Sequence, residues 1–306
     1  MSSKAPQGAT VTGDPAGGLK IPVLAIVGVG LIGGSFAAAL RRAGVVGRVL
    51  GAGRRPETLA QAQQLGIIDE AVSLREAAAR ADLILVSAPV GAFRSIFTEL
   101  GATLSDTALI TDGGSTKLDV VQAARDGLGH RIGQFVPAHP MAGSHESGPQ
   151  AAVATLYDGR RVMLTPLAEN RPEDIARVES AWRACGAQVV CLDPAGHDAV
   201  MAAISHLPHW IAALYMQHIL QSADPALRLE MAGPGFRDFT RITAGSPEMW
   251  RDIFISNRHA MLGELAALRA VLDRAEQALE ASDAKWLVEM LEASAEARRG
   301  WAGPSA

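Results

Sequence analysis

The chain has 306 residues, of which 48% are hydrophobic and 20% charged, and its formal net charge is −4. This composition is typical of a globular protein with room for two domains, and it excludes the basic excess expected of a nucleic-acid-binding protein. Cys185 and Cys191 are too few for a disulfide framework and have no metal-ligating neighbours. We therefore interpret each cysteine as a small buried hydrophobe.

The first 20 residues, MSSKAPQGATVTGDPAGGLK, form a polar segment rich in Gly, Ser, Thr and Pro. This segment lacks the apolar centre of a signal peptide, so we expect residues 1–20 to be a disordered tail. The run IPVLAIVGVGLIGG is too short and too rich in glycine to cross a membrane, and we expect no other run to reach that length. These features predict a cytoplasmic protein with no membrane association.

Residues 21–193 alternate between short apolar runs and helical stretches. Near-continuous apolar runs are typical of strands in a parallel sheet that is covered on both faces. Helices between such strands indicate right-handed crossovers, and therefore a doubly wound α/β domain of the Rossmann type. The expected strands are VLAIVG, GRVLGAG, DLILVSAP, ALITDGG, QFVPAHP, RVMLTP and AQVVCLD, and the expected helices span residues 35–43, 56–65, 92–100 and 116–127.

Residues 194–306 show helical periodicity and are rich in Ala, Leu and Glu, without strand signals. They predict an all-helical domain after the α/β domain. Long helices with apolar faces and a modest core of their own often pack against a second copy, so we expect a homodimer.

A glycine-rich loop, GVGLIGG at residues 28–34, follows the first expected strand and opens a helix. Gly28 permits a tight turn, Gly30 lets the backbone approach a pyrophosphate, and Gly33 allows close packing of helix on strand. The free N–H groups of the helix N-terminus attract the same anion. In this context the pattern predicts a dinucleotide-binding site.

The second expected strand ends in Arg54 and Arg55, where an Asp or Glu would bind the ribose hydroxyls of NAD. Two guanidinium groups can hold a 2′-phosphate, so we predict NADP as the preferred cofactor, with NAD possible. The alternative is that both arginines are ordinary surface charges. The remaining residues that we assign to cofactor binding are Leu31, Ile32, Ala88, Pro89 and Asp112.

Two segments at the expected carboxyl edge of the sheet carry candidate catalytic groups. In TDGGSTK we expect one of Ser115 and Thr116 to cap the following helix, and the other hydroxyl to face the cleft. In PAHPMAGSHESGP, His139 stands where a strand meets an irregular loop, which suits a rigidly held general base. Ser144 and His145 are further candidates on that loop.

The helical region contributes histidines at helical spacing. The segment SHLPHWIAALY places His206 and His209 on one helix face, and Pro208 between them is expected to bend the helix. A zinc site would need a third ligand, but His197 and His218 fall on the opposite face, so we expect no metal.

The segment GPGFRDFTRITAGSPEMW carries two arginines four residues apart, Arg237 and Arg241. Either they are free to bind a substrate carboxylate, or they pair with Asp238 and Asp252.

Six segments in this order resemble the prephenate/arogenate dehydrogenase family of tyrosine biosynthesis: GVGLIGGS, DGGSTK, HPMAGSHESG, SHLPH, FRDFTRI and PEMWRDIF. The resemblance extends over about residues 23–264. It implies a Rossmann domain joined to a helical dimerisation domain, with the active site between them. It also implies oxidative decarboxylation of prephenate to 4-hydroxyphenylpyruvate, or of arogenate to tyrosine, with hydride transfer to NAD(P)+.

The resemblance also implies roles for individual residues. His139 would accept the proton of the ring hydroxyl, Ser115 would bind that hydroxyl and position His139, and Arg241 would hold a substrate carboxylate. His145 stands where many members have an acidic or small residue, close to the substrate side chain. The residues implied to line the substrate pocket are Ser144, His145, His206, His209 and Trp250.

Two other functions are compatible with a Rossmann domain followed by helices. A β-hydroxyacid dehydrogenase would be expected to place a catalytic lysine early in the helical domain, but residues 196–218 contain no lysine. A non-catalytic NADP-sensing protein would not need a histidine, a serine and an arginine beside the nicotinamide.

Overall fold

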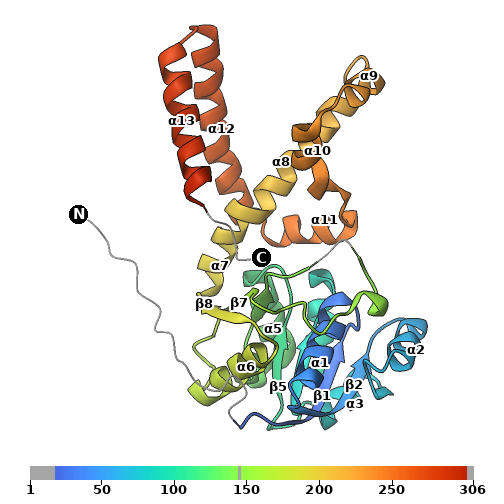
Figure 1. The fold of residues 1–306 in the computed structure, drawn as a ribbon. Coiled ribbons are helices and arrows are strands. Elements are labelled where there is room, and N and C mark those ends of the chain that lie inside the picture. Colours follow the sequence, from blue (N-terminus) through green and yellow to red (C-terminus); the bar gives the residue numbers. More distant parts are fainter. Residues whose placement is uncertain (1–17, 144–145, 302–306) are drawn as a thin grey trace.

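The computed structural model describes residues 18–143 and 146–301. Most of the tail expected to be disordered, and both Ser144 and His145, lie outside the described residues. The N-terminal part of the chain forms a parallel five-stranded sheet with the order β3-β2-β1-β4-β5 (Figure 1). Its strands are β1 (Ile21–Val27), β2 (Val46–Ala52), β3 (Glu70–Ala71), β4 (Leu83–Val86) and β5 (Leu109–Asp112).

Both faces of this sheet are covered by helices, because successive side chains along each strand point to opposite faces. On β1, Leu24 and Ile26 enter one core, whereas Ala25 and Val27 enter the other. The first core is covered by α1 (Leu31–Arg42), α2 (Pro56–Gln64) and α6 (Pro172–Ala184). The second is covered by α3 (Leu74–Arg80), α4 (Phe93–Gly101) and α5 (Leu118–Leu128). The doubly wound Rossmann-type fold is thereby confirmed.

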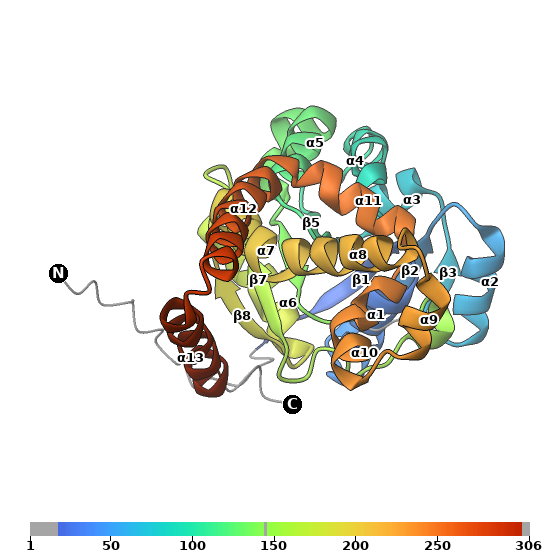
Figure 2. The ribbon, with the colours of Figure 1, turned by 90° about the horizontal axis from the view of Figure 1, so that it is seen from above.

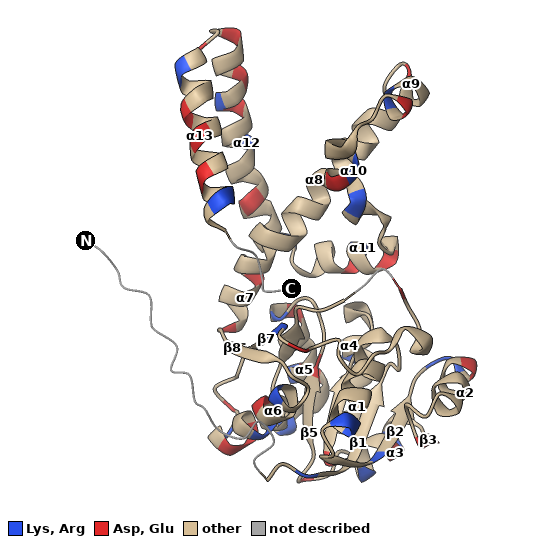
Figure 3. Cartoon of the chain, in the orientation of Figure 1, with Lys and Arg blue, Asp and Glu red and all other residues tan. Residues whose placement is uncertain are grey.

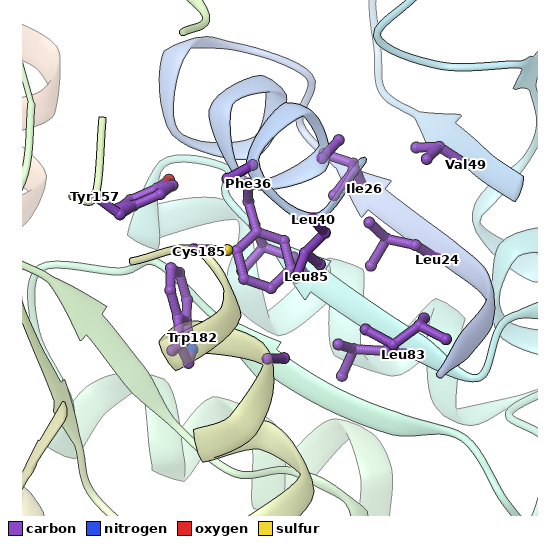
Figure 4. Close-up of a cluster of buried hydrophobic side chains, with 14 of the residues drawn as sticks. Leu24, Ile26, Phe36, Leu40, Val49, Leu83, Leu85, Tyr157, Trp182 and Cys185 are labelled. Atoms are coloured by element: carbon purple, nitrogen blue, oxygen red, sulfur yellow. The ribbon is translucent and has the colours of Figure 1, made fainter. Parts of the chain in front are cut away.

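Aromatic side chains fill the core beneath α1 (Figure 4). The rings of Phe36 and Trp182 lie 4.5 Å apart between centroids, and Tyr157 meets Trp182 edge-on at 5.4 Å. Cys185 is buried in this cluster, as expected. The same expectation is wrong for Cys191, which is exposed because it lies on the edge strand β8 of a second sheet.

The last three expected strands form that second sheet, in the order β6-β7-β8, rather than extending the first one. They are β6 (Ala138–Pro140), β7 (Arg161–Leu164) and β8 (Gln188–Cys191). β6 is antiparallel to β7, and the described residues between them form short turns, such as Pro149–Ala151, rather than a crossover helix. The helix α6 connects β7 to β8, which are parallel.

The described part of the chain after β8 is largely helical, and it rises as two arms above the sheet (Figures 1 and 2). Its helices are α7 (Pro194–Met201), a π-helical turn (Ala202–His206), α8 (Leu207–Leu220), α9 (Pro225–Glu230), α10 (Pro234–Thr240), a 3-10 turn (Arg241–Ala244), α11 (Pro247–Ser256), α12 (Arg258–Glu280) and α13 (Ala284–Gly300). The π-helical turn ends two residues before Pro208, which has no N–H to donate to that turn. The bend expected at Pro208 thus takes the form of a local widening of a continuing helix.

This helical part buries few apolar side chains of its own. Its internal core among the described residues centres on Ala202, Leu207 and Met261. Many large apolar side chains on the same helices are exposed, including Met231, Leu262, Leu272 and Leu279. The helical domain therefore has a large apolar surface that a single described chain does not cover.

The continuous helix Pro194–Leu220 is long and apolar enough, by length and composition, to cross a membrane, so the expectation that no run reaches that length is wrong. Asp198 is its only charged residue, and α8 has none (Figure 3). A third of the most apolar window is buried within the structure. The polar side chains of His197, Asp198 and His206 on this helix are also buried.

Candidate active site

A cavity of about 610 Å³ lies at the carboxyl ends of β1, β2 and β4. At this edge the strand order reverses, since β2 lies on one side of β1 and β4 on the other, and doubly wound folds bind ligands at such a point. Gly28 lines the cavity at a φ of +92°, and a Cβ there would lie 2.7 Å from the carbonyl oxygen of Ser87. A Cβ on Gly30 would meet nothing within 4 Å, so the backbone here is open to a ligand.

Gly33 does not line the cavity; a Cβ on it would lie 2.5 Å from Ile26 Cγ2 and 2.6 Å from the carbonyl oxygen of Gly28. Close contact of α1 with β1 therefore requires glycine here. The three glycines occupy the positions that a dinucleotide loop needs.

The other predicted cofactor residues divide into two groups. Arg54, Arg55, Ala88 and Pro89 line the cavity. Leu31, Ile32 and Asp112 do not. The cavity also contains a carboxylate that the sequence analysis did not anticipate, Glu99 of α4.

Ile32 connects the glycine loop to the next part of the site. A Cβ on Gly113 would lie 3.0 Å from Ile32 Cγ2 and 3.8 Å from Pro140 Cδ. The start of α1, the end of β5 and the strand that carries His139 therefore meet at one place. The carbonyl oxygen of Ile32 also accepts a 2.6 Å hydrogen bond from Tyr157.

Asp112, at the end of β5, is completely buried and bound on both oxygens. One oxygen accepts the N–H of Ala138 at 2.9 Å, and the other binds Gly114 N–H at 2.8 Å and Lys117 Nζ at 2.5 Å. These donors fix the start of β6 relative to β5. The carboxylate therefore supports the strand of His139, rather than facing the cofactor cavity.

His139 lies in the middle of β6 and is 8% exposed. Its Nδ1 lies 2.9 Å from Nε2 of His197, and Nδ1 of His197 lies 2.8 Å from Oδ1 of Asp198. A strand of the α/β domain thus supplies the imidazole, while α7 of the helical domain supplies its two successive partners. Neither His197 nor Asp198 was predicted as a site residue.

Asp198 also caps α5 across the domain boundary. Its Oδ1 accepts the N–H of Lys117 at 2.8 Å, and its Oδ2 accepts the N–H of Leu118 at 2.9 Å. The expectation that Ser115 or Thr116 caps this helix is therefore wrong, because a carboxylate from another domain takes the position. Thr116 instead bonds the hydroxyl of Ser256 at 2.9 Å, and Ser115 makes no hydrogen bond with a described residue.

Burial controls the charge of these groups. It lowers the pKa of His139 well below the ordinary value for histidine, and the neighbouring His197, Lys117 and His206 lower it further. Burial also lowers the pKa of His197, against the opposing effect of Asp198. For Asp198, burial raises the pKa, but hydrogen bonds from His197 and the two N–H groups outweigh it, so the net shift is downward. At neutral pH the three groups are therefore imidazole, imidazole and carboxylate.

The helical domain adds an aromatic cluster that contains the two histidines predicted at helical spacing. The ring of His209 stacks on Trp250 at 3.5 Å, and His206 meets the same indole edge-on at 6.3 Å. His206 Nδ1 lies 3.0 Å from the side-chain nitrogen of Asn257, a further residue that the sequence analysis missed.

Both histidines of this cluster are almost fully buried, and burial lowers their pKa values, to about 4 for His206. His206 Nε2 and His209 Nδ1 have no hydrogen-bond partner among the described residues. Buried polar atoms without partners are rare, so these two nitrogens are well placed to meet a polar ligand.

Arg241 begins the 3-10 turn after α10 and is exposed. Neither it nor Arg237 forms an ion pair with a described residue, and Asp252 instead pairs with Arg251 at 2.7 Å. The alternative that these arginines are paired with Asp238 and Asp252 is therefore wrong within the described structure. Gly245, at the end of the same turn, packs against the indole of Trp250.

Comparison with known proteins follows the same division of the chain. Residues 36–191 match the model of the prephenate dehydrogenase nucleotide-binding domain, and residues 193–293 match that of the prephenate dehydrogenase dimerization domain. The chain belongs to the prephenate dehydrogenase family. The resemblance in the sequence motifs is thereby confirmed.

Family members from several organisms align along most of the chain. Prephenate dehydrogenase of Bacillus subtilis is 34% identical over 279 residues, which cover 90% of this chain and 75% of that protein. Cyclohexadienyl dehydrogenase of Zymomonas mobilis is 32% identical over 283 residues, which cover 90% of this chain and 94% of that protein.

Two solved structures have the same fold. Prephenate dehydrogenase of Aquifex aeolicus, in complex with hydroxyphenyl propionate and NAD+, has a TM-score of 0.86 and 34% identity, covering 92% of this chain and 99% of that one. Arogenate dehydrogenase of Synechocystis has a TM-score of 0.79 and 30% identity, covering 90% and 99%.

Proposed function

We propose that this protein catalyses the NAD(P)+-dependent oxidative decarboxylation of prephenate, of arogenate, or of both, in tyrosine biosynthesis. The observation that carries the proposal is the neutral, buried imidazole of His139, backed by His197 and Asp198, at the edge where the dinucleotide loop ends. Relatives named for both substrates share this chain's two domains. A β-hydroxyacid dehydrogenase or a sensor of NADP gains no support from either line of evidence.

The chemistry needs a base and an anchor for carboxylates. The nicotinamide of the bound cofactor supplies the hydride acceptor. His139, neutral at pH 7, accepts the proton of the ring hydroxyl as the carbonyl forms. The ring then loses carbon dioxide and becomes aromatic, so the protein's main task is to orient the substrate.

The remaining predicted residues complete the pocket in this proposal. Ser115, exposed in part after β5, binds the ring hydroxyl. Arg241, without an ion-pair partner among the described residues, holds a carboxylate. His206, His209 and Trp250 form the wall contributed by the helical domain. The assignment of Ser144 and His145 to the substrate pocket stays a prediction, since both lie outside the described residues.

For the cofactor, we propose that NADP is preferred over NAD. Arg54 and Arg55 both line the cavity, directly after β2, where the 2′-position of the adenosine ribose lies in this fold. Neither arginine forms an ion pair with a described residue, so both guanidinium groups are available to a phosphate. Glu99 lines the same cavity, and its carboxylate would oppose a phosphate that approached it closely.

We also propose that the protein is a cytoplasmic homodimer, with an α/β domain at residues 21–193 and a helical domain at residues 194–306. The match to a dimerization-domain model and the exposed apolar side chains of these helices support this assembly. The apolar surface of Pro194–Leu220 is then covered by the second copy rather than by lipid.

A two-by-two kinetic comparison tests the proposal. Purified protein is mixed with prephenate or arogenate and with NAD+ or NADP+, and the absorbance of the reduced nicotinamide is followed. We expect reduction with at least one substrate, and a higher kcat/KM with NADP+ than with NAD+. If neither substrate reduces either cofactor, the proposed activity is wrong.

A further inference from the structure

Two histidines beside the proposed substrate pocket are each held at one ring nitrogen, and both connections pass through Asp198. Its side chain binds His197 at 2.8 Å, and His197 binds Nδ1 of His139 at 2.9 Å. Its main-chain oxygen accepts the side-chain N–H of Asn257 at 2.8 Å, and the same nitrogen lies 3.0 Å from Nδ1 of His206. All five residues are buried.

The direction of the first set of hydrogen bonds follows from atoms whose role is fixed. The main-chain N–H groups of Lys117 and Leu118 can only donate, so both carboxyl oxygens of Asp198 act as acceptors. His197 Nδ1 must then donate to Asp198. In a neutral His197 the other nitrogen is an acceptor, so Nδ1 of His139 carries the hydrogen and Nε2 has the free lone pair. Burial, which keeps His197 neutral, supports this assignment.

The direction of the second set is fixed by a carbonyl group. The main-chain oxygen of Asp198 can only accept, so the atom of Asn257 that faces it is the NH2 nitrogen. That nitrogen also donates to Nδ1 of His206, which is therefore an acceptor. The hydrogen of neutral His206 then sits on Nε2, the buried atom with no partner among the described residues.

We propose that Asp198 and Asn257 are positioning residues that set His139 and His206 in opposite tautomers. His139 presents an acceptor nitrogen to the substrate hydroxyl, whereas His206 presents a donor to a substrate oxygen. The proposal rests on the dehydrogenase function proposed above. It assigns this positioning task to α7, which carries Asp198, and to the junction between α11 and α12, where Asn257 lies. It also links the task to domain docking, because Asp198 caps α5.

The direct test is a spectroscopic one that does not depend on activity. The full chain, labelled with ¹⁵N in histidine, is studied at pH 7.5 by long-range proton–nitrogen correlation of the imidazole rings. His139→Asn and His206→Asn identify the two signals by their loss. We expect the Nδ1–H tautomer for His139 and the Nε2–H tautomer for His206. Finding the reverse tautomer at either ring overturns the proposal, even if the protein reduces NADP+ with prephenate.

Variants then separate the two positioning roles. Asp198→Asn puts an amide where the α5 N–H groups and His197 both need an acceptor, and we expect kcat to fall about 10²–10⁴-fold, the scale seen when a catalytic histidine loses its tautomer. Asn257→Leu removes the donor to His206, and we expect KM for the substrate to rise with a smaller change in kcat. The assignment would be contradicted if Asp198→Asn mainly raised KM and Asn257→Leu mainly lowered kcat.

Conservative replacement at His197 distinguishes positioning from packing. In His197→Gln the side-chain oxygen can still accept from His139 Nδ1, whereas His197→Leu leaves that N–H unpaired. We expect Gln to retain at least about tenfold more kcat than Leu, in line with the cost of losing a supporting hydrogen bond. Equal losses would mean that His197 only fills space.

Ser256→Ala is the matched control for domain docking. It removes the hydroxyl bonded to Thr116, in the same contact between the domains and next to Asn257, but leaves both histidines their partners. We expect kinetics and imidazole spectra close to those of the unmodified protein. If this variant loses as much kcat as Asp198→Asn, domain docking rather than tautomer control explains the effect. An unmodified protein that is inactive with both substrates would count against the proposed function alone.

Discussion

At the scale of residues, the charge state of the histidines in the site depends on burial more than on close charge pairing. His139, His197 and His206 are all held neutral by removal from water, and each has a pKa below the ordinary histidine value. The carboxylate of Asp198 lies two hydrogen bonds away from His139. Its negative charge stabilises His139 once that histidine gains a proton. In the proposed reaction, this arrangement favours the uptake of one proton at His139.

Replacing His139 by Asn tests its role as a general base. Asn keeps a polar group on β6 but cannot accept the proton, so we expect kcat to fall about 10²–10⁴-fold while cofactor affinity, measured by fluorescence titration with NADPH, stays nearly unchanged. In the unmodified protein, protonation of His139 would inactivate the base. Because the pKa of His139 lies below 6.5, the ordinary value for histidine, we expect kcat/KM to fall only below pH 6.5. Unchanged turnover in the variant would remove His139 from the mechanism.

At the scale of elements, two short junctions place the residues on which the proposed function depends. The junction after β2 brings Arg54 and Arg55 to the cofactor cavity. The junction between β8 and α7 starts the helix that carries His197 and Asp198 towards β6 and α5. In the proposed function, cofactor choice and proton transfer belong to separate elements, and they should be separable by mutation.

The double change Arg54→Ala and Arg55→Ala tests the first junction. Each charge-assisted hydrogen bond contributes roughly 1.5–3 kcal/mol, so loss of even one contact to the 2′-phosphate should weaken NADP binding by about tenfold or more. NAD has no phosphate there, so its KM should change little. The measurement is KM for both cofactors at saturating substrate. Equal losses for NADP and NAD would mean that the arginines do not bind the phosphate.

At the scale of the whole molecule, the two domains differ in how they bury apolar surface. The α/β domain has two large cores on either side of its sheet. The helical domain has a small core and two arms with exposed leucines, such as Leu272 and Leu279 on α12 (Figure 1). Exposed apolar patches on this scale usually mark an interface, which agrees with the proposed dimer.

Charges placed on α12 test that assembly. Leu272 and Leu279 lie two turns apart on one helix face and are 58% and 66% exposed, so Leu272→Glu with Leu279→Glu should leave each protomer folded but weaken the dimer. Sedimentation velocity at micromolar concentration should then show monomer, with an unchanged circular dichroism spectrum. Leu65→Glu, a 52% exposed leucine of the α/β domain, is the control and should remain dimeric. A monomeric unmodified protein would contradict the assembly.

Much of the fold and part of the candidate site follow from local sequence. The glycine loop, the apolar strands and the helical C-terminal half each depend on residues close together in the chain, so their patterns predict the Rossmann-type fold and the cofactor class. His139 could also be predicted as a candidate base, because its position between a strand and an irregular loop is visible in the local sequence. The separate sheet β6-β7-β8 was not predicted, since strand pairing depends on partners outside each run.

Only the tertiary structure decided how the histidines are held. His139 and His197 are 58 residues apart, and Asp198 lies 81 residues from the Lys117 N–H that it accepts. Helical spacing along residues 197–209 could not show that His197 meets β6, because that contact is between segments far apart in the sequence. Hydrogen-bond direction and burial are properties of packed neighbours. The sequence by itself therefore determined the fold class and the candidate base. Only the tertiary structure decided which partners fix the ring nitrogen that carries its hydrogen.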